Sequence, residues 1–123
     1  MPFPIILLCD DEYLIRSVGK KLLSACGFEA ITVGSGTEVL HEVLKKGKPF
    51  KAIILDMEMP EMSGLEVYAE LERQNIRVPV VLSTGHVDEE HLEAARSAGI
   101  SHVLEKPYTL KDLRMTLHDI GCV

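Results

Sequence analysis

Long apolar runs are missing from this sequence of 123 residues. A membrane-spanning helix needs about 20 consecutive apolar residues, so we expect no membrane segment. The first residues carry no basic segment of the kind that begins a secretory signal peptide. Basic residues are also in deficit, because 13 Lys and Arg face 19 Asp and Glu. The formal charge of -6 argues against non-specific nucleic-acid binding, which needs a basic surface.

Cysteine is scarce, and its three positions, Cys9, Cys26 and Cys122, lie far apart. An odd, unclustered set provides neither a disulfide framework nor a cysteine-rich metal site. Cys9 falls in a predicted strand and Cys26 near a predicted helix end, so we expect both to be small buried apolar residues. These features favour a reducing, cytoplasmic setting.

Linkers, internal repeats and low-complexity segments are absent too, so we expect residues 1–123 to form a single domain. Apolar residues make up 46% of the chain and charged residues 26%, which is the balance of a soluble globular protein with a real core.

Apolar runs alternate with amphipathic segments along the whole chain. The strand-like runs lie near 4–9, 28–33, 51–56, 78–83 and 101–105. Three of them are almost continuous Val, Ile and Leu, which is typical of strands covered on both faces of a parallel sheet. Apolar residues at helical spacing follow each run, namely Ile15, Val18, Leu22 and Cys26; Val39, Leu40, Val43 and Leu44; Leu65, Tyr68 and Leu71; Leu92, Ala95 and Ala98; and Leu110, Leu113, Leu117 and Ile120. The pattern predicts an α/β fold, (βα)5, with helices on both faces of a doubly wound five-stranded parallel sheet.

Local signals support these boundaries. Residues 35–38, 63–66 and 109–112 each have the spacing of a capping box at a helix start. Gly27 and Gly99 stand where two helices should end, at positions that favour a left-handed backbone.

Polar side chains stand at the ends of four predicted strands. Asp56 ends the third apolar run, and Asp10 and Asp11 end the first. Thr84 and Lys106 close the fourth and fifth. The carboxyl ends of parallel strands meet at one edge of the sheet, where open α/β sheets bind ligands. We therefore expect these five side chains to converge.

The acids predict a metal site. Two or three carboxylates within a few ångströms repel one another unless a cation lies between them. Mg²⁺ prefers such oxygen ligands, with Mn²⁺ as a second option, and we expect Asp10, Asp11, Asp56 and the carbonyl of Glu58 to bind it. The lack of His and Cys in the cluster argues against Zn²⁺. Alone, the acids after the first strand would only mark a helix N-terminus.

The whole set suits phosphoryl transfer around one carboxylate. In-line transfer needs a positioned nucleophile and neutralised oxygens, and Asp56 is the candidate nucleophile. Lys106 and Thr84 would contact the phosphoryl oxygens, and a cis bond before Pro107 would aim the lysine inward. The plainer alternatives are a surface lysine and a helix-capping hydroxyl.

These residues carry a resemblance that covers essentially the whole chain. The matching stretches are Leu8-Cys9-Asp10-Asp11-Glu12, Asp56-Met57-Glu58-Met59-Pro60 with Gly64, Ser83-Thr84-Gly85 and Glu105-Lys106-Pro107-Tyr108. The sequence resembles the response-regulator receiver domains (CheY-like) of two-component signal transduction. The resemblance implies the flavodoxin-like strand order 2-1-3-4-5.

The resemblance also implies a phosphorelay function. Asp56 would accept a phosphoryl group from a histidine kinase or phosphotransfer protein, giving an aspartyl phosphate. Asp11 would bind Mg²⁺ directly and Asp10 mainly through water, and Thr84 and Lys106 would carry the switch. The protein would catalyse its own phosphorylation and dephosphorylation without being a turnover enzyme. The surface of the fourth helix, fifth strand and fifth helix would change, and a homodimer through it, or an effector domain outside the chain, is left open.

Some positions depart from the family pattern. Val103 occupies the position three before the lysine where an aromatic residue is common, and His102 should face the other side of the sheet. Gly85 stands where alanine is common. Glu58 and His86 flank the expected path of an attacking water and are candidates for setting the phosphate lifetime, the alternative being simple solvent exposure.

Two other functions compete with the switch. The first is a receiver-like protein-binding module that is not phosphorylated, which the intact acids, Thr84 and Lys106 disfavour. The second is a phosphatase of the haloacid-dehalogenase type, but here the acid pair precedes the nucleophile and Glu58 holds the place of the second Asp. A flavin site would need a Ser/Thr/Gly-rich loop after the first strand, which this sequence lacks.

Overall fold

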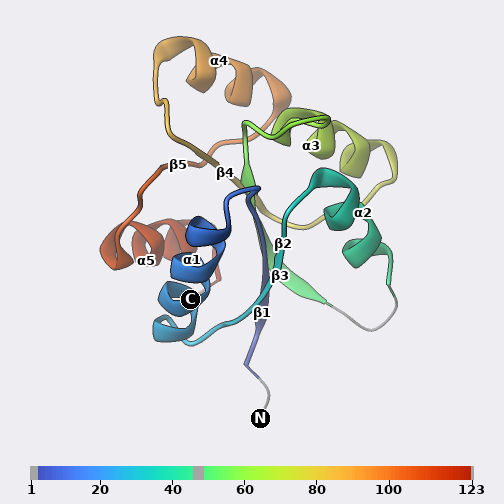
Figure 1. Cartoon of the computed structure of the whole chain (residues 1–123). Coiled ribbons are helices and arrows are strands. Elements are labelled where there is room, and N and C mark those ends of the chain that lie inside the picture. Colours follow the sequence, from blue (N-terminus) through green and yellow to red (C-terminus); the bar gives the residue numbers. More distant parts are fainter. Residues whose placement is uncertain (1–2, 46–48, 123) are drawn as a thin grey trace.

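One parallel sheet forms the centre of the computed structural model, which describes residues 3–45 and 49–122 (Figure 1). In those residues the strands are β1 (Ile5–Cys9), β2 (Glu29–Val33), β3 (Phe50–Asp56), β4 (Val80–Thr84) and β5 (Val103–Glu105). Their order across the sheet is β2-β1-β3-β4-β5, and all pairs are parallel. The predicted fold class and strand order are confirmed.

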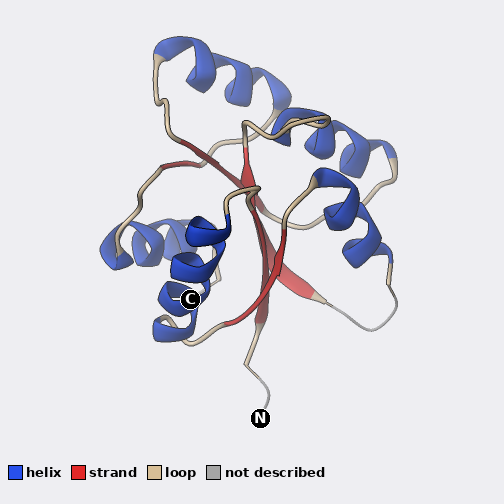
Figure 2. Cartoon of the chain, in the orientation of Figure 1, coloured by secondary structure: helices blue, strands red, loops and turns tan. Residues whose placement is uncertain are grey.

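Helices cover both faces of the sheet (Figure 2). They are α1 (Tyr13–Ala25), α2 (Gly36–Leu44), α3 (Gly64–Arg73), α4 (Glu89–Ala98) and α5 (Leu110–Asp119). Alternate strand residues face opposite sides, so Ile6 and Leu8 pack with α1 and α5. Leu7 and Cys9 pack with α2, α3 and α4. This two-sided burial explains the continuous apolar runs.

Helix ends follow the local signals closely. Ser63 and Thr109 form complete capping boxes with Glu66 and Asp112. The Ser35 side chain also accepts from the backbone N–H three residues on, but its hydroxyl donates to that residue's carboxylate, so the box is only half formed. Gly27 and Gly99 adopt φ of 90° and 97°, as expected after helix ends.

The strand boundaries differ most in the second half of the sheet. β4 begins one residue after Pro79 and extends to Thr84, where it pairs with Glu105. β5 is shorter than the predicted 101–105 and begins at Val103, because Leu82 and its successors are its only partners in the described sheet. The excluded residues are Ser101 and His102, and the His102 carbonyl still accepts from the Leu82 N–H at 3.1 Å, so His102 contacts β4 just before β5 begins.

The cysteines are only partly as expected. All three are free, and Cys9 is fully buried. The prediction that Cys26 is buried was wrong, since this residue is half-buried at the C-terminal end of α1. Among the described residues, no helix has the length and apolar character needed to cross a bilayer.

Candidate functional site

The buried polar residues gather at the carboxyl edge of the sheet. Asp10 follows β1, Asp56 ends β3, and Ser83 and Thr84 end β4. In the described part of the chain, these four are the buried polar or charged residues, and in the order given they are 0%, 1%, 1% and 0% exposed. Burying charge is costly unless it is paired or used. Three of the four are residues that the sequence pattern selected.

Three carboxylates converge at this edge. One oxygen from each of Asp10, Asp11 and Asp56 lies within 4.8 Å of the others. Asp11 is exposed, so its carboxylate faces solvent at the rim, whereas the other two are enclosed. Glu58 is not part of this group through its side chain, and the predicted role of its carbonyl stays a prediction.

Lys106 points into the cluster. Its Nζ lies 3.0 Å from Oδ2 of Asp10 and 3.1 Å from Oδ1 of Asp56. Its backbone N–H donates to the carbonyl of Thr84 at 2.8 Å, which fixes the residue beside the end of β4. The following bond to Pro107 is cis, as the sequence suggested. The plainer alternative of an outward-facing surface lysine is therefore wrong.

The environment of Asp56 is unusual for a carboxylate. Burial, and after it the neighbouring charge of Asp10, raise the pKa of Asp56 to about 6, against the effects of the Glu58 N–H and of Lys106. Oδ1 accepts from the backbone N–H of Glu58 at 3.1 Å. Oδ2 is buried and has no hydrogen-bond partner among the described residues. An orphaned carboxylate oxygen beside two further acids is a donor set that fits a hard cation such as Mg²⁺.

Two attractive contacts keep Lys106 charged. Burial alone would lower the pKa of Lys106, but its hydrogen bond to Asp10 and the charges of Asp56 and Asp10 outweigh that effect, and the pKa is raised. The Lys106 side chain is 12% exposed. A charged lysine within reach of both carboxylates can bind an anion that arrives at Asp56.

Thr84 lies at the same edge, but its hydroxyl has a partner that the sequence did not reveal. Oγ1 donates to Oε1 of Glu58 at 2.8 Å and accepts from the backbone N–H of His86 at 3.1 Å. Glu58 was expected to offer a carbonyl or to flank a water path. No local pattern marks a side-chain contact between the last residue of β4 and the loop that follows β3.

Two further contacts hold the acids in place, and the sequence pattern did not predict them. Arg16 on α1 donates from Nη1 to the carbonyl of Asp10 at 2.8 Å. Gly64, at the start of α3, lies directly behind the acceptor, because a Cβ there would overlap with the Asp56 carbonyl oxygen. The motif contained this glycine, but its spacing gave no sign of which backbone it would touch.

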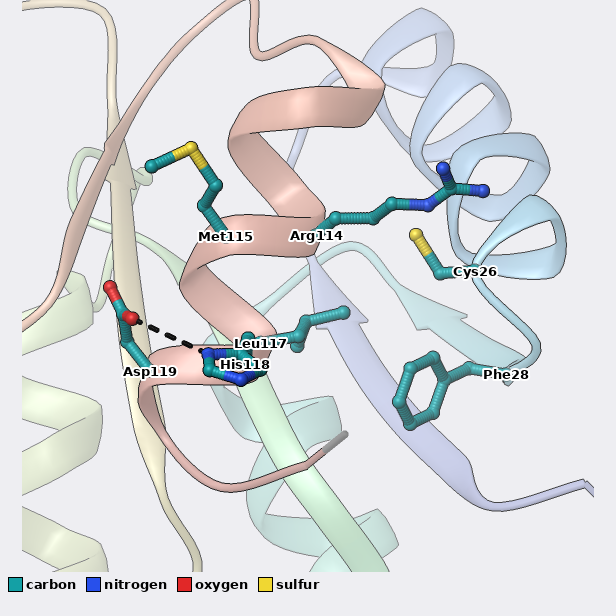
Figure 3. Close-up of a pocket in the computed structure, with 7 residues that line it drawn as sticks. All are labelled: Cys26, Phe28, Arg114, Met115, Leu117, His118 and Asp119. Carbon is teal, nitrogen blue, oxygen red and sulfur yellow. Dashed lines mark ion pairs between the residues drawn. The ribbon is translucent and has the colours of Figure 1, made fainter.

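An apolar pocket of about 440 Å³ lies elsewhere, between the C-terminal ends of α1 and α5 (Figure 3). Phe28 and Leu117 form its floor, and the exposed Met115 and the ion-paired His118 and Asp119 lie at its rim. These helix ends are at the opposite edge of the sheet from the acids. The pocket is therefore separate from the candidate site.

A doubly wound sheet with acids and a lysine at its carboxyl edge defines a flavodoxin-like protein of the CheY type. The family model described as the response regulator receiver domain matches residues 6–118, and the chain belongs to this family. It is a receiver domain of two-component signalling.

Individual relatives agree with this assignment. Nodulation protein W of Bradyrhizobium diazoefficiens is 29% identical over 109 residues, which are 89% of this chain and 47% of that protein. The chemotaxis protein CheY homolog of Campylobacter jejuni is 26% identical over 94% of this chain and 90% of its own length. The solved structure of Vibrio cholerae CheY4 matches with a TM-score of 0.87 at 28% identity, covering 96% of this chain and 98% of that one. The chain thus spans about half of the first relative and nearly all of the others.

Proposed function

We propose that this receiver domain is a phosphorylatable switch that accepts a phosphoryl group on Asp56 from a histidine kinase or a phosphotransfer protein. The observation that carries the proposal is the buried Asp56 carboxylate, which has one oxygen held by Lys106 and Glu58 and the other without a partner. We assign the attack on phosphorus to Oδ2. The new P–O bond forms as the bond to the donor's leaving group breaks, giving an aspartyl phosphate.

The surrounding residues prepare this carboxylate. Asp11, Asp10 and Asp56 would hold Mg²⁺ together with the Glu58 carbonyl, and the ion would neutralise charge on the transferred oxygens. Lys106 pairs with Asp56 before transfer and with a phosphoryl oxygen afterwards. Thr84 donates its hydroxyl proton to another phosphoryl oxygen. Loss of phosphate is a second transfer, in which water attacks phosphorus as the P–O bond to Asp56 breaks, releasing inorganic phosphate and the free carboxylate, so the protein catalyses its own dephosphorylation.

A protein donor needs a surface beside Asp56. Leu14 and Val18 on α1 are 73% and 53% exposed and lie one helical turn apart. A small cleft joins Ile15 and Val18 to Lys106 and Pro107, so this apolar face is continuous with the loop that carries the lysine. We propose that the helices of the donor dock here. Leu14→Arg should then slow transfer from a protein donor and leave transfer from acetyl phosphate unchanged.

We assign the output surface to the elements that follow Thr84 and Lys106. Thr84 leads from β4 towards α4, and Lys106 leads from β5 towards α5. If both side chains move towards one phosphoryl group, the α4–β5–α5 surface must repack. Phosphorylation shifts the population of the repacked conformation only by the difference in free energy that the phosphoryl contacts supply between the two conformations. An effector domain or a second copy of the chain would recognise this surface.

Treatment with acetyl phosphate and Mg²⁺ tests the proposal, with intact mass as the readout. A single phosphoryl adduct that needs Mg²⁺ is expected. A chain that stays unmodified, yet still binds partner proteins, would instead fit the receiver-like binding module.

A further inference from the structure

The hydroxyl proton of Thr84 is already committed in this structure. A threonine hydroxyl has one hydrogen to donate, and Oγ1 donates it to Oε1 of Glu58 at 2.8 Å. The carbonyl of His86 is a poorer acceptor at 3.3 Å. Thr84 is 0% exposed, so water does not compete freely for this proton. A phosphoryl oxygen can therefore receive it only if the bond to Glu58 breaks.

Glu58 also contacts the phosphoryl acceptor. Its backbone N–H donates to Oδ1 of Asp56 at 3.1 Å, while its carboxylate reaches across to the end of β4. The preceding residue, Met57, donates its N–H to the carbonyl of Ser83 at 2.8 Å, which ties the two strand ends together. One residue thus contacts both the acceptor carboxylate and the switch hydroxyl.

We propose that the Glu58 side chain is a latch: its hydrogen bond holds Thr84 in the resting arrangement and so sets the equilibrium between the resting and the switched conformation. The inference rests on the proposed phosphorylation of Asp56. A phosphoryl group on Asp56 adds negative charge two residues from the Glu58 carboxylate and competes for the same proton. Glu58 acts through Thr84, which makes it a positioning residue for the switch.

The size of the effect follows from the type of bond. A hydrogen bond of this kind contributes about 0.5–1.5 kcal/mol net, and Glu58 is solvent-exposed, so the latch should change the switching equilibrium about two- to tenfold. Its removal should favour the state in which Thr84 turns towards Asp56.

Affinity for beryllium fluoride at saturating Mg²⁺ provides the test, since this anion mimics a phosphoryl group on aspartate without hydrolysis. Affinity is measured by NMR from the amide signals of Thr84 and its neighbours. Glu58→Ala should bind the anion about two- to tenfold more tightly than the wild type, with Glu58→Gln between them. Glu61→Gln, an exposed acid of the same loop, is the matched control and should have the wild-type affinity.

A double-mutant cycle separates the latch from simple charge removal. In a Thr84→Val background Glu58→Ala should have no effect, and in a Thr84→Ser background its effect should return. A gain that persists in Thr84→Val would show that Glu58 acts by charge alone and would overturn the latch. An unchanged affinity in Glu58→Ala itself would also overturn it. If the wild type binds no beryllium fluoride, the proposed phosphoryl site fails instead, so the two failures are distinguishable.

Discussion

The ammonium group of Lys106 lies 3.1 Å from Oδ1 of Asp56, although Lys106 directly follows β5 and Asp56 ends β3, two strands away in the sheet. The same group lies 3.0 Å from Oδ2 of Asp10, so it bridges two buried carboxylates. This contact leaves Oδ2 of Asp56 without a partner among the described residues. The lysine thereby pairs with one oxygen of the acceptor, and the other oxygen stays buried and unpaired.

Removal of this lysine should affect stability and signalling differently. Lys106→Ala leaves two buried carboxylates unpaired, which should cost about 3 kcal/mol of unfolding free energy without metal. Mg²⁺ should restore part of that loss. Some phosphorylation should persist, but the switched conformation should be weakly populated. Thermal melts with and without Mg²⁺, together with NMR of the modified protein, measure both effects. Lys111→Ala, on the exposed side of α5, is the control, and equal melting of the two variants would contradict the account.

The acidic cluster predicts a second outcome. Asp11→Ala should lower Mg²⁺ affinity and phosphorylation together, because the exposed Asp11 is the acid best placed to bind an ion from solvent. Loss of an outer-sphere partner already costs about 10–100-fold in metal affinity, so loss of this ligand should cost at least roughly tenfold. Calorimetric titration with Mg²⁺ measures the change. Glu12→Ala removes a neighbouring exposed acid and should bind normally; a similar loss there would point to general charge instead.

The raised pKa of Asp56, about 6 instead of 3.8, predicts how stability depends on pH. Without metal and between pH 3.8 and about 6, Asp56 keeps its proton in the folded protein, whereas the unfolded chain has released it. The stabilisation from this group is fully present below pH 3.8 and is lost as the pH rises through about 6. Mg²⁺ competes with that proton, so it should raise Tm more at about pH 7.5 than at about pH 5.

Thermal melts of the wild type and of Asp56→Asn across this range isolate the contribution of the one carboxyl group. In chelator, the Tm of Asp56→Asn should increase relative to the Tm of the wild type as the pH rises. A difference that does not vary with pH would contradict the raised pKa.

Two glycines near the site should differ strongly in their response to substitution by alanine. A Cβ at Gly64 would overlap with the Asp56 carbonyl oxygen and lie 3.0 Å from Cα of Met57, so Gly64→Ala must displace the backbone of the acceptor. Overpacking of this kind costs about 1–3 kcal/mol, and phosphorylation should fall with it. A Cβ at Gly85 meets no described atom within 4 Å, and its φ is not left-handed. Gly85→Ala should therefore change stability by no more than about 0.5 kcal/mol in denaturant unfolding.

The sequence predicted the sheet well because the cause of its pattern is local. Strands covered on both faces are continuously apolar, and the residues after them are free to be polar, so Asp10, Asp56 and Thr84 stood out in the chain itself. β5 was predicted too long, since neither Ser101 nor His102 marks in the sequence where pairing with β4 begins.

Side-chain contacts across the edge of the sheet could not be predicted from the sequence. The hydrogen bonds from Thr84 to Glu58 and from Arg16 to the Asp10 carbonyl depend on how far each side chain reaches across the sheet edge. Glu58 was recognised as a variable position of interest, but its partner depended on a side-chain direction that no spacing encodes. The partial exposure of Cys26 has the same origin, because a helix end can be apolar and still lie at the rim of a pocket.

The most direct test of the central claim locates the modification at a single residue. The wild-type protein and Asp56→Asn are treated with acetyl phosphate and Mg²⁺, reduced with borohydride, and digested for mass spectrometry. An acyl phosphate at Asp56 should be converted to homoserine at that position, and Asp56→Asn should remain unmodified. An unmodified wild type, or an adduct on another residue that persists in Asp56→Asn, would contradict the account.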